Sequence, residues 1–264
     1  MTKLTAEQLT ALLRGPKPLQ LAQYNLSGAN LIQANLVGAD LNGANLHRAV
    51  LIGANLKKAL LSEADLSDTY LNGANFSEVD LSHANLVRAY LPGAKLLEAD
   101  LIEAEMSGVV LSYAIMPRAN LIRANLTGAF LVKTNLNHGH LVLTNLYRAK
   151  MNWINLKGSN LLAANLSETD LSNANLSGAN LSRANLSESN LTNCNLNGAN
   201  LSGATLRKTN LTDSQVNETI LYGADMSWAN LSGVDLSRAD MSEADLEKVD
   251  HFGFRRLGEK VHLI

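Results

Sequence analysis

Residues 26–46 read LSGANLIQANLVGADLNGANL, in which a leucine returns at every fifth position. The spacing continues from Leu21 to Leu246 without a gap, and the few residues that replace leucine, such as Phe76 and Met106, are also apolar. A period of five fits neither an α-helix, which repeats every ~3.6 residues, nor a flat strand, which repeats every second residue. A helix would spread these leucines around its circumference, and a strand would send them to opposite faces.

A chain that turns a corner once per quintet places all of these leucines inside. Four such corners close a coil of about twenty residues, and stacked coils bury leucines that no single coil could bury alone. The residue two before each leucine is most often Ala, which fits beside a large core side chain. Glycine is frequent two after the leucine, as at Gly28 and Gly38, where a turn requires a positive φ. The Asn or Asp before each leucine is expected to hydrogen-bond to the backbone at the corners.

The repeated unit Ala-(Asn/Asp)-Leu-x-x, as in Ala29-Asn30-Leu31 and Ala174-Asn175-Leu176, resembles the motif of the pentapeptide-repeat family. The resemblance covers nearly the whole chain between Leu21 and Leu246. It implies an all-β fold, a right-handed quadrilateral parallel β-helix. At the ~4.8 Å spacing of adjacent strands, about 11 to 12 coils would form a rod roughly 55 Å long.

The sequence divides the chain into three parts. Residues 1–20 are predicted to form an N-terminal capping helix and linker, residues 21–248 the repeat β-helix, and residues 249–264 a C-terminal cap or tail. Thr5 and Gln8 fit a capping box at the start of a helix over residues 5–14. Phe252, Phe254 and Leu257 are expected to close the last coil, and the resemblance adds a homodimer through this end as an alternative that the residues leave open.

Composition excludes several classes of function. The net charge is −2 and the pI about 6.3, so direct nucleic-acid binding is not expected. The one cysteine, Cys194, cannot form a disulfide within the chain, which suits a reducing compartment. No apolar run is long enough for a signal peptide or a membrane span. We therefore expect a cytoplasmic protein.

The sequence also lacks the motifs that carry chemistry. It contains no nucleophile elbow, phosphate-binding loop, dinucleotide fingerprint or zinc pattern. Glu63, His83 and Glu103 fall in one column, but on an open surface where a metal ion would lack further ligands. A rod filled with leucine is also expected to leave no cavity. We predict no catalytic residues, no cofactor, no metal and no enzymatic activity.

Residues twenty apart should stack on adjacent coils, so the sequence can be read as a map of the surface. On one face the Asn or Asp before leucine is replaced by apolar residues, and more apolar residues lie beside them. The candidate partner interface consists of Ile32, Val50, Ile52, Tyr70, Tyr90, Val110, Tyr113, Phe130, Val132 and Trp153. Contiguous apolar patches rich in aromatic residues are typical of interfaces. The alternative is an aromatic ladder that only stiffens the rod.

The leading hypothesis is a non-enzymatic scaffold or regulator that binds an unknown protein partner through this flat face. The resemblance implies a bacterial protein, since photosynthetic bacteria carry many members of the family and some members regulate differentiation or transport. Two alternatives stay open: a DNA-mimicking protein that interacts with and protects DNA gyrase, and a passive structural rod. Near-neutral charge disfavours the mimic, because those family members carry strongly negative surfaces.

Overall fold

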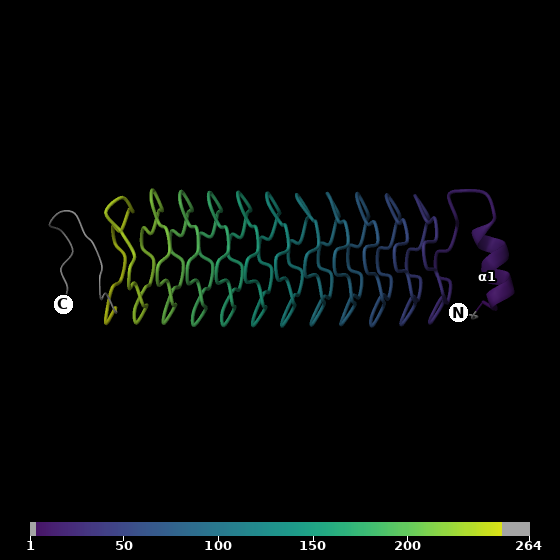
Figure 1. Ribbon diagram of the computed structural model, residues 1–264, viewed down its shortest axis with the longest axis horizontal. Coiled ribbons are helices and arrows are strands. Elements are labelled where there is room, and N and C mark those ends of the chain that lie inside the picture. Colours follow the sequence, from purple (N-terminus) through teal and green to yellow (C-terminus); the bar gives the residue numbers. More distant parts are fainter. Residues whose placement is uncertain (1–3, 250–264) are drawn as a thin grey trace.

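The computed structural model describes residues 4–249, which form one helix followed by a long stack of coils (Figure 1). The helix α1 spans Ala6–Leu13 and lies at the end of the stack where the repeats begin (Figure 1). The coils contain single-residue parallel bridges, and each bridge joins residues twenty positions apart, from Gln20 with Asp40 to Asp225 with Asp245. The predicted β-helix with twenty residues per coil is therefore confirmed.

Two kinds of backbone hydrogen bond hold each quintet in place. Between coils, the N–H of Leu31 donates to the carbonyl of Val50 at 2.8 Å, and the N–H of Val50 donates to the carbonyl of Ala29 at 2.9 Å. Between successive quintets, the N–H of Ala34 donates to the carbonyl of Leu31 at 3.0 Å and closes a turn. The same pattern repeats along the rod, so a chain without long strands still pairs its backbone polar groups.

The third residue of these turns has a positive φ, as a type II turn requires. Gly28 and Gly38 meet this requirement at 66° and 64°, as the sequence predicts. Many turns instead place a residue with a side chain there, such as Arg48 at 57° and Trp153 at 62°. None of these residues is Val, Ile or Thr, because a branched Cβ is the least compatible with positive φ.

The core is a continuous column of leucine with small residues beside it. Leu51 and Leu111 are completely buried, as are most central residues of the quintets. Where the small residue is polar, its side chain donates to the carbonyl of a central leucine. Thr134 Oγ1 lies 2.8 Å from the Leu111 oxygen, and Ser214 Oγ lies 2.6 Å from the Leu191 oxygen. These buried hydroxyls therefore have the partners that burial demands.

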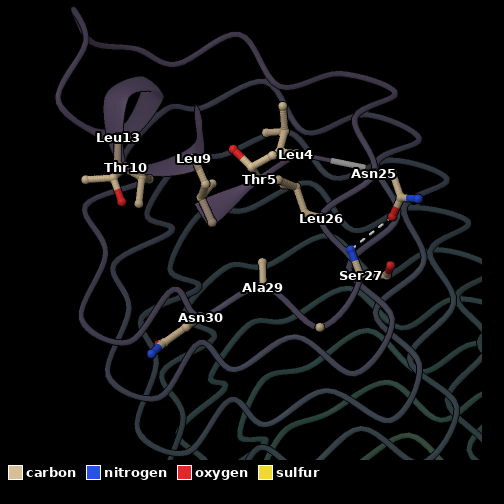
Figure 2. A pocket seen from close by; sticks show the side chains of 11 residues that line it. Leu4, Thr5, Leu9, Thr10, Leu13, Asn25, Leu26, Ser27, Ala29 and Asn30 are labelled. Carbon is tan, nitrogen blue, oxygen red and sulfur yellow. Dashed lines mark hydrogen bonds between the residues drawn. The ribbon is translucent and has the colours of Figure 1, made fainter. Parts of the chain in front are cut away.

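Helix α1 begins with the predicted capping box. The N–H of Gln8 donates to Thr5 Oγ1, and the N–H of Thr5 donates to Gln8 Oε1 at 2.8 Å. Leu9 of this helix is buried and joins the core of the coils. Leu9 and Leu26 line a groove between the helix and the first coil (Figure 2). The volume of this groove is about 480 Å³. Leu9 of the helix thus packs with the core at the start of the stack.

The Asn or Asp before each leucine bonds to the backbone as predicted. Asn25 Oδ1 accepts from the N–H of Ser27 at 3.1 Å, and Asp40 Oδ1 accepts from the N–H of Asn42 at 3.1 Å. A side chain without an acceptor leaves the N–H two residues on without this bond. At two such places the later residue is proline: Tyr90 is followed by Pro92, and Ile115 by Pro117. Proline has no N–H to satisfy, so these pairs remove the donor together with its acceptor.

The regular ladder changes near the C-terminal end of the described residues. The N–H of Glu218 donates to the carbonyl of Arg238 at 3.1 Å, one residue later than the pattern elsewhere, and Arg238 lacks the positive φ of its equivalents. Phe252, Phe254 and Leu257 lie outside the described residues, so the C-terminal cap and the homodimer remain predictions.

Tyr70 and Tyr90 differ in whether the residue two positions later has an N–H, and this difference allows a matched comparison of two variants. Tyr70→Asn should create a bond from the N–H of Asn72 to the new Oδ1, whereas Tyr90→Asn has only Pro92 two residues on. Both variants lose the same contact between Tyr70 and Tyr90. We expect Tyr70→Asn to be the more stable by about 0.5–1.5 kcal/mol in urea unfolding, the net value of one hydrogen bond. Adding Pro92→Ser to Tyr90→Asn should remove the difference; equal stability of the two single variants would contradict the explanation.

The buried cysteine gives a second prediction. Burial raises the pKa of the Cys194 thiol to about 12, and its Sγ donates to the carbonyl of Leu171 at 2.9 Å. Because the thiolate is the reactive form, iodoacetamide at about pH 8 should label the folded protein far more slowly than the unfolded protein. Mass spectrometry of timed samples, with a guanidinium-unfolded sample as control, measures both rates. Equal rates would show that the thiol is accessible.

Candidate protein-interaction face

One face of the rod carries most of the candidate residues from the sequence. We call it the apolar face; it consists of the outward side chains of the quintets centred on Leu31, Leu51, Leu71, Leu91, Leu111, Leu131 and Met151. Successive bridges bring five of the candidates into one unbroken column, namely Val50, Tyr70, Tyr90, Val110 and Phe130. Residues twenty positions apart in the sequence thereby become direct neighbours in space, and the column spans eighty residues of sequence.

The larger side chains of the apolar face are exposed. The exposed fraction is 59% for Tyr113, 55% for Trp153 and 53% for Tyr70, and the other exposed members are Ile32, Ile52, Tyr90 and Phe130. Val50, Val110 and Val132 are half-buried. From the coil of Ile32 to the coil of Trp153 the face extends about 29 Å, at the ~4.8 Å spacing of parallel strands. It is therefore a long, narrow strip of apolar surface.

Contacts between coils also stiffen this strip. The rings of Tyr70 and Tyr90 meet edge to face, with centroids 6.5 Å apart and planes at 63°. The Nζ of Lys133 lies 5.7 Å from the ring centroid of Tyr113, and that of Lys150 lies 5.6 Å from the ring centroid of Phe130. Such contacts contribute about 0.5–1.5 kcal/mol each. They order the rings but leave their outer surfaces open, so a ladder and an interface are compatible.

Charges are distributed unequally over the four faces. Every ion pair between described residues lies on the other three faces, and most of these pairs join adjacent coils. Arg88 donates to both carboxylate oxygens of Asp68, at 2.8 and 2.7 Å. Arg148 and Glu168 form a similar pair at 2.7 Å. The apolar face carries no Asp or Glu between residues 30 and 153.

The Asp68–Arg88 and Glu168–Arg148 pairs lower the pKa of their carboxyl groups. The hydrogen bond from Arg88 lowers the pKa of Asp68 below its ordinary value, against an opposing effect of desolvation. The hydrogen bonds from Arg148 and Tyr147 lower the pKa of Glu168 in the same way. Because the pKa of each carboxyl group is lower in the folded state than in the unfolded state, its ion pair stabilises the fold at pH values above the unfolded-state pKa. This stabilisation is lost as the pH falls through the folded-state pKa.

The other faces of the rod have less distinctive surroundings. Ile102, Ile122, Val142 and Leu162, on the opposite face, are all half-buried. In the column of Glu63, His83 Nδ1 lies 3.5 Å from Glu103, and Arg123 also contacts Glu103. Among residues 4–249 no group of three or more His, Cys, Asp or Glu side chains is arranged to hold a metal ion. In the same range no helix is long and apolar enough to cross a membrane.

Sequence reasoning missed part of the apolar surface. Ile115 and Leu97, exposed at 47% and 40%, lie just beyond the edge of the apolar face. Ile115 follows Tyr113 by two residues, across a corner of the coil, and forms a bridge with Lys95. The sequence could have indicated this extension, because Lys95 and Ile115 both replace the Asn that usually precedes the central residue.

A chain that turns every five residues around a filled apolar core is a pentapeptide β-helix. The family model described as "Pentapeptide repeats" matches in overlapping copies from residue 25 to residue 250. The chain therefore belongs to the pentapeptide-repeat family. A search of curated proteins gave no match.

Solved structures of this family are similar to the chain to different degrees. HetL, involved in heterocyst differentiation regulation in the cyanobacterium Nostoc sp. strain PCC 7120, is 32% identical, with 99% of this chain and 100% of HetL covered and a TM-score of 0.43. A pentapeptide repeat protein of the Arabidopsis thaliana thylakoid lumen is 34% identical, over 34% of this chain and 63% of that chain, with a TM-score of 0.34. QnrB1, a plasmid-mediated fluoroquinolone resistance protein, is 16% identical, over 70% and 88%, with a TM-score of 0.40.

The Asp68–Arg88 pair gives a prediction about pH. Arg88→Gln should lower the urea midpoint at about pH 7, where Asp68 is ionised, and the difference from the unmodified protein should shrink at about pH 2, where the carboxyl is protonated. Arg183→Gln is the control, because Arg183 forms no ion pair. A difference that stays constant between the two pH values would contradict an electrostatic origin.

Proposed function

We propose that this chain is a non-enzymatic scaffold or regulator that binds a protein partner through the apolar face. The observation that supports it most directly is the exposure of Tyr70, Tyr113 and Trp153, each more than half exposed, on one continuous strip. Large aromatic side chains supply much of the binding energy in protein interfaces. A strip without acidic groups also costs little desolvation when a partner covers it.

The rest of the rod is consistent with a supporting role. In residues 164–211 Ser, Asn and Gly dominate the outward positions. Such a polar and uniform surface offers few anchors for a partner, in contrast to the coils from Ile32 to Trp153. The proposal thus gives the N-terminal half of the rod the binding role and the later coils the role of a rigid spacer.

The proposal includes several features that the sequence suggested. The β-helix is right-handed, α1 caps its first coil, and the protein acts in the cytoplasm of a bacterium. The regulatory role in this proposal is carried over from HetL, which is described as involved in heterocyst differentiation regulation. A gyrase-protecting DNA mimic has less support, since 22 basic residues nearly balance 24 acidic ones.

The test compares matched variants on two opposite faces. Tyr70→Asn with Trp153→Asn removes two anchors of the apolar face, and Leu60→Asn with Leu143→Asn changes the equivalent positions on the opposite face. Leu60 and Leu143 are exposed at 43% and 50%, so both double variants remove exposed apolar surface. Asn is the usual residue at the first position of each pair and tolerates the positive φ of the second.

Proteins captured from a native lysate by the unmodified chain should be lost with the first double variant and retained with the second. Quantitative mass spectrometry of the three captures measures this, after circular dichroism has shown that all three proteins are folded. The proposal fails if every captured protein is retained by both variants, or if the opposite-face variant causes the greater loss.

A further inference from the structure

We infer that the partner segment bound by the apolar face is an acidic amphipathic α-helix of about twenty residues. This inference rests on the proposed function and specifies the chemistry of the partner. Three properties of the face carry it: its shape, its unpaired positive charges and its lack of acidic groups.

The shape of the face matches one helix. The strip is about 29 Å long. Its width is roughly 10 Å, because about three outward positions of each coil lie across it at ~3.3 Å per residue. A helix of twenty residues is about 30 Å long and presents an apolar stripe of similar width. The strip is too small for a second globular domain, because stable interfaces bury about 800 Å² on each partner and this one offers roughly 300 Å². The expected complex is therefore weak and reversible.

Unpaired cations collect around this strip. Most Lys and Arg residues of the described coils form ion pairs; six in residues 21–249 do not. Lys133 and Lys150 lie on the apolar face itself, Arg48 precedes one edge of it, and Lys95 follows the other edge. The remaining two, Lys157 and Arg183, lie on other faces. Four of the six cations without an ion pair thus lie on or beside one strip, although Arg48 is also attracted to Asp68 on the adjacent coil.

No acidic group on the strip competes for these cations. The apolar face has no Asp or Glu between residues 30 and 153. Beside the face, Asp68 is already paired with Arg88; beyond its end, Asp170 forms a backbone bridge with Lys150, but no ion pair joins their side chains. A helix with Glu or Asp on both sides of its apolar stripe would place carboxylates next to Arg48 on one side and Lys95 on the other. Complementary charges of this kind favour correct partners and speed association. A second copy of the chain fits poorly, since it would place cations against cations.

The experiment selects helices without assuming the answer. A displayed library of helices of about twenty residues keeps one apolar stripe constant and varies the flanking positions among Glu, Gln and Lys. Selection on the unmodified protein should enrich Glu on both flanks. The best Glu-flanked peptide should bind at least about tenfold more tightly than its Lys-flanked counterpart in fluorescence anisotropy, and added salt should weaken it.

Charge reversal provides the decisive control. In the variant Lys133→Glu with Lys150→Glu the preference should reverse toward the Lys-flanked peptide. The matched variant Lys157→Glu with Arg183→Glu, which reverses two unpaired cations on other faces, should leave the preference unchanged. Both variants change the net charge of the chain equally, so a general charge effect would appear in both.

The remaining outcomes separate this inference from the proposed function. Selected helices that need Tyr70 and Trp153 but show no preference for Glu would overturn the acidic partner and leave the scaffold function standing. Helices insensitive to every variant of the face would overturn both. Phosphatidylserine vesicles or a single-stranded oligonucleotide are tested in parallel. If either binds the face more tightly than the Glu-flanked peptide and loses binding in Lys133→Glu with Lys150→Glu, a different class of ligand occupies it.

Discussion

The turn that ends each quintet is the constraint on which this structure depends. Its third residue must adopt a positive φ, and its closing hydrogen bond runs from the N–H of the small residue to the carbonyl of the central leucine, as between Ala34 and Leu31. Without this turn the next leucine would point outward, and no coil would close. Residues other than glycine pay an energetic penalty in this conformation. They persist because each turn is held on both sides by bonds to the adjacent coils, such as that from the N–H of Gln33 to Ile52.

Because the core and the turns determine the residue type at so many positions, only a few columns of outward side chains are free to vary from one member of the family to another. The residue before the leucine normally serves the backbone, as Asn25 does for the N–H of Ser27. An apolar residue there gives up that bond, so a run such as Tyr70, Tyr90 and Val110 sacrifices local stability at consecutive coils. The pairing of Tyr90 with Pro92 shows one way in which the chain reduces this cost. The partner interface that we propose would account for a cost that is repeated over neighbouring coils.

Much of the fold could be predicted from the sequence, because its period determines its register. The twenty-residue stacking, the buried leucines, the capping box of Thr5 and Gln8 and the Asn bonds to the backbone all follow from the five-residue pattern. The spread of positive φ beyond glycine could not be predicted, since it depends on neighbouring coils that hold each turn. The shifted bond between Glu218 and Arg238 was also beyond prediction, because residues 236–240 match the repeat as well as any other quintet. For the candidate face, the sequence predicted the column from Val50 to Phe130 but not which cations stay unpaired, which depends on side-chain contacts between coils.

Similarity within this family must be weighed by position rather than by percentage. Two of every five residues, the leucine and the small residue two positions before it, are set by the core, so two members of the family can share these residues and still have unrelated surfaces. What distinguishes one rod from another is the set of outward positions, where substitution does not disturb the core. In this chain those positions change from Tyr, Val and Phe on one face between residues 50 and 130 to Asp and Asn from residue 170 onward. The boundary between these two stretches, near Trp153, therefore says more about partner choice than does the repeat that the whole family shares.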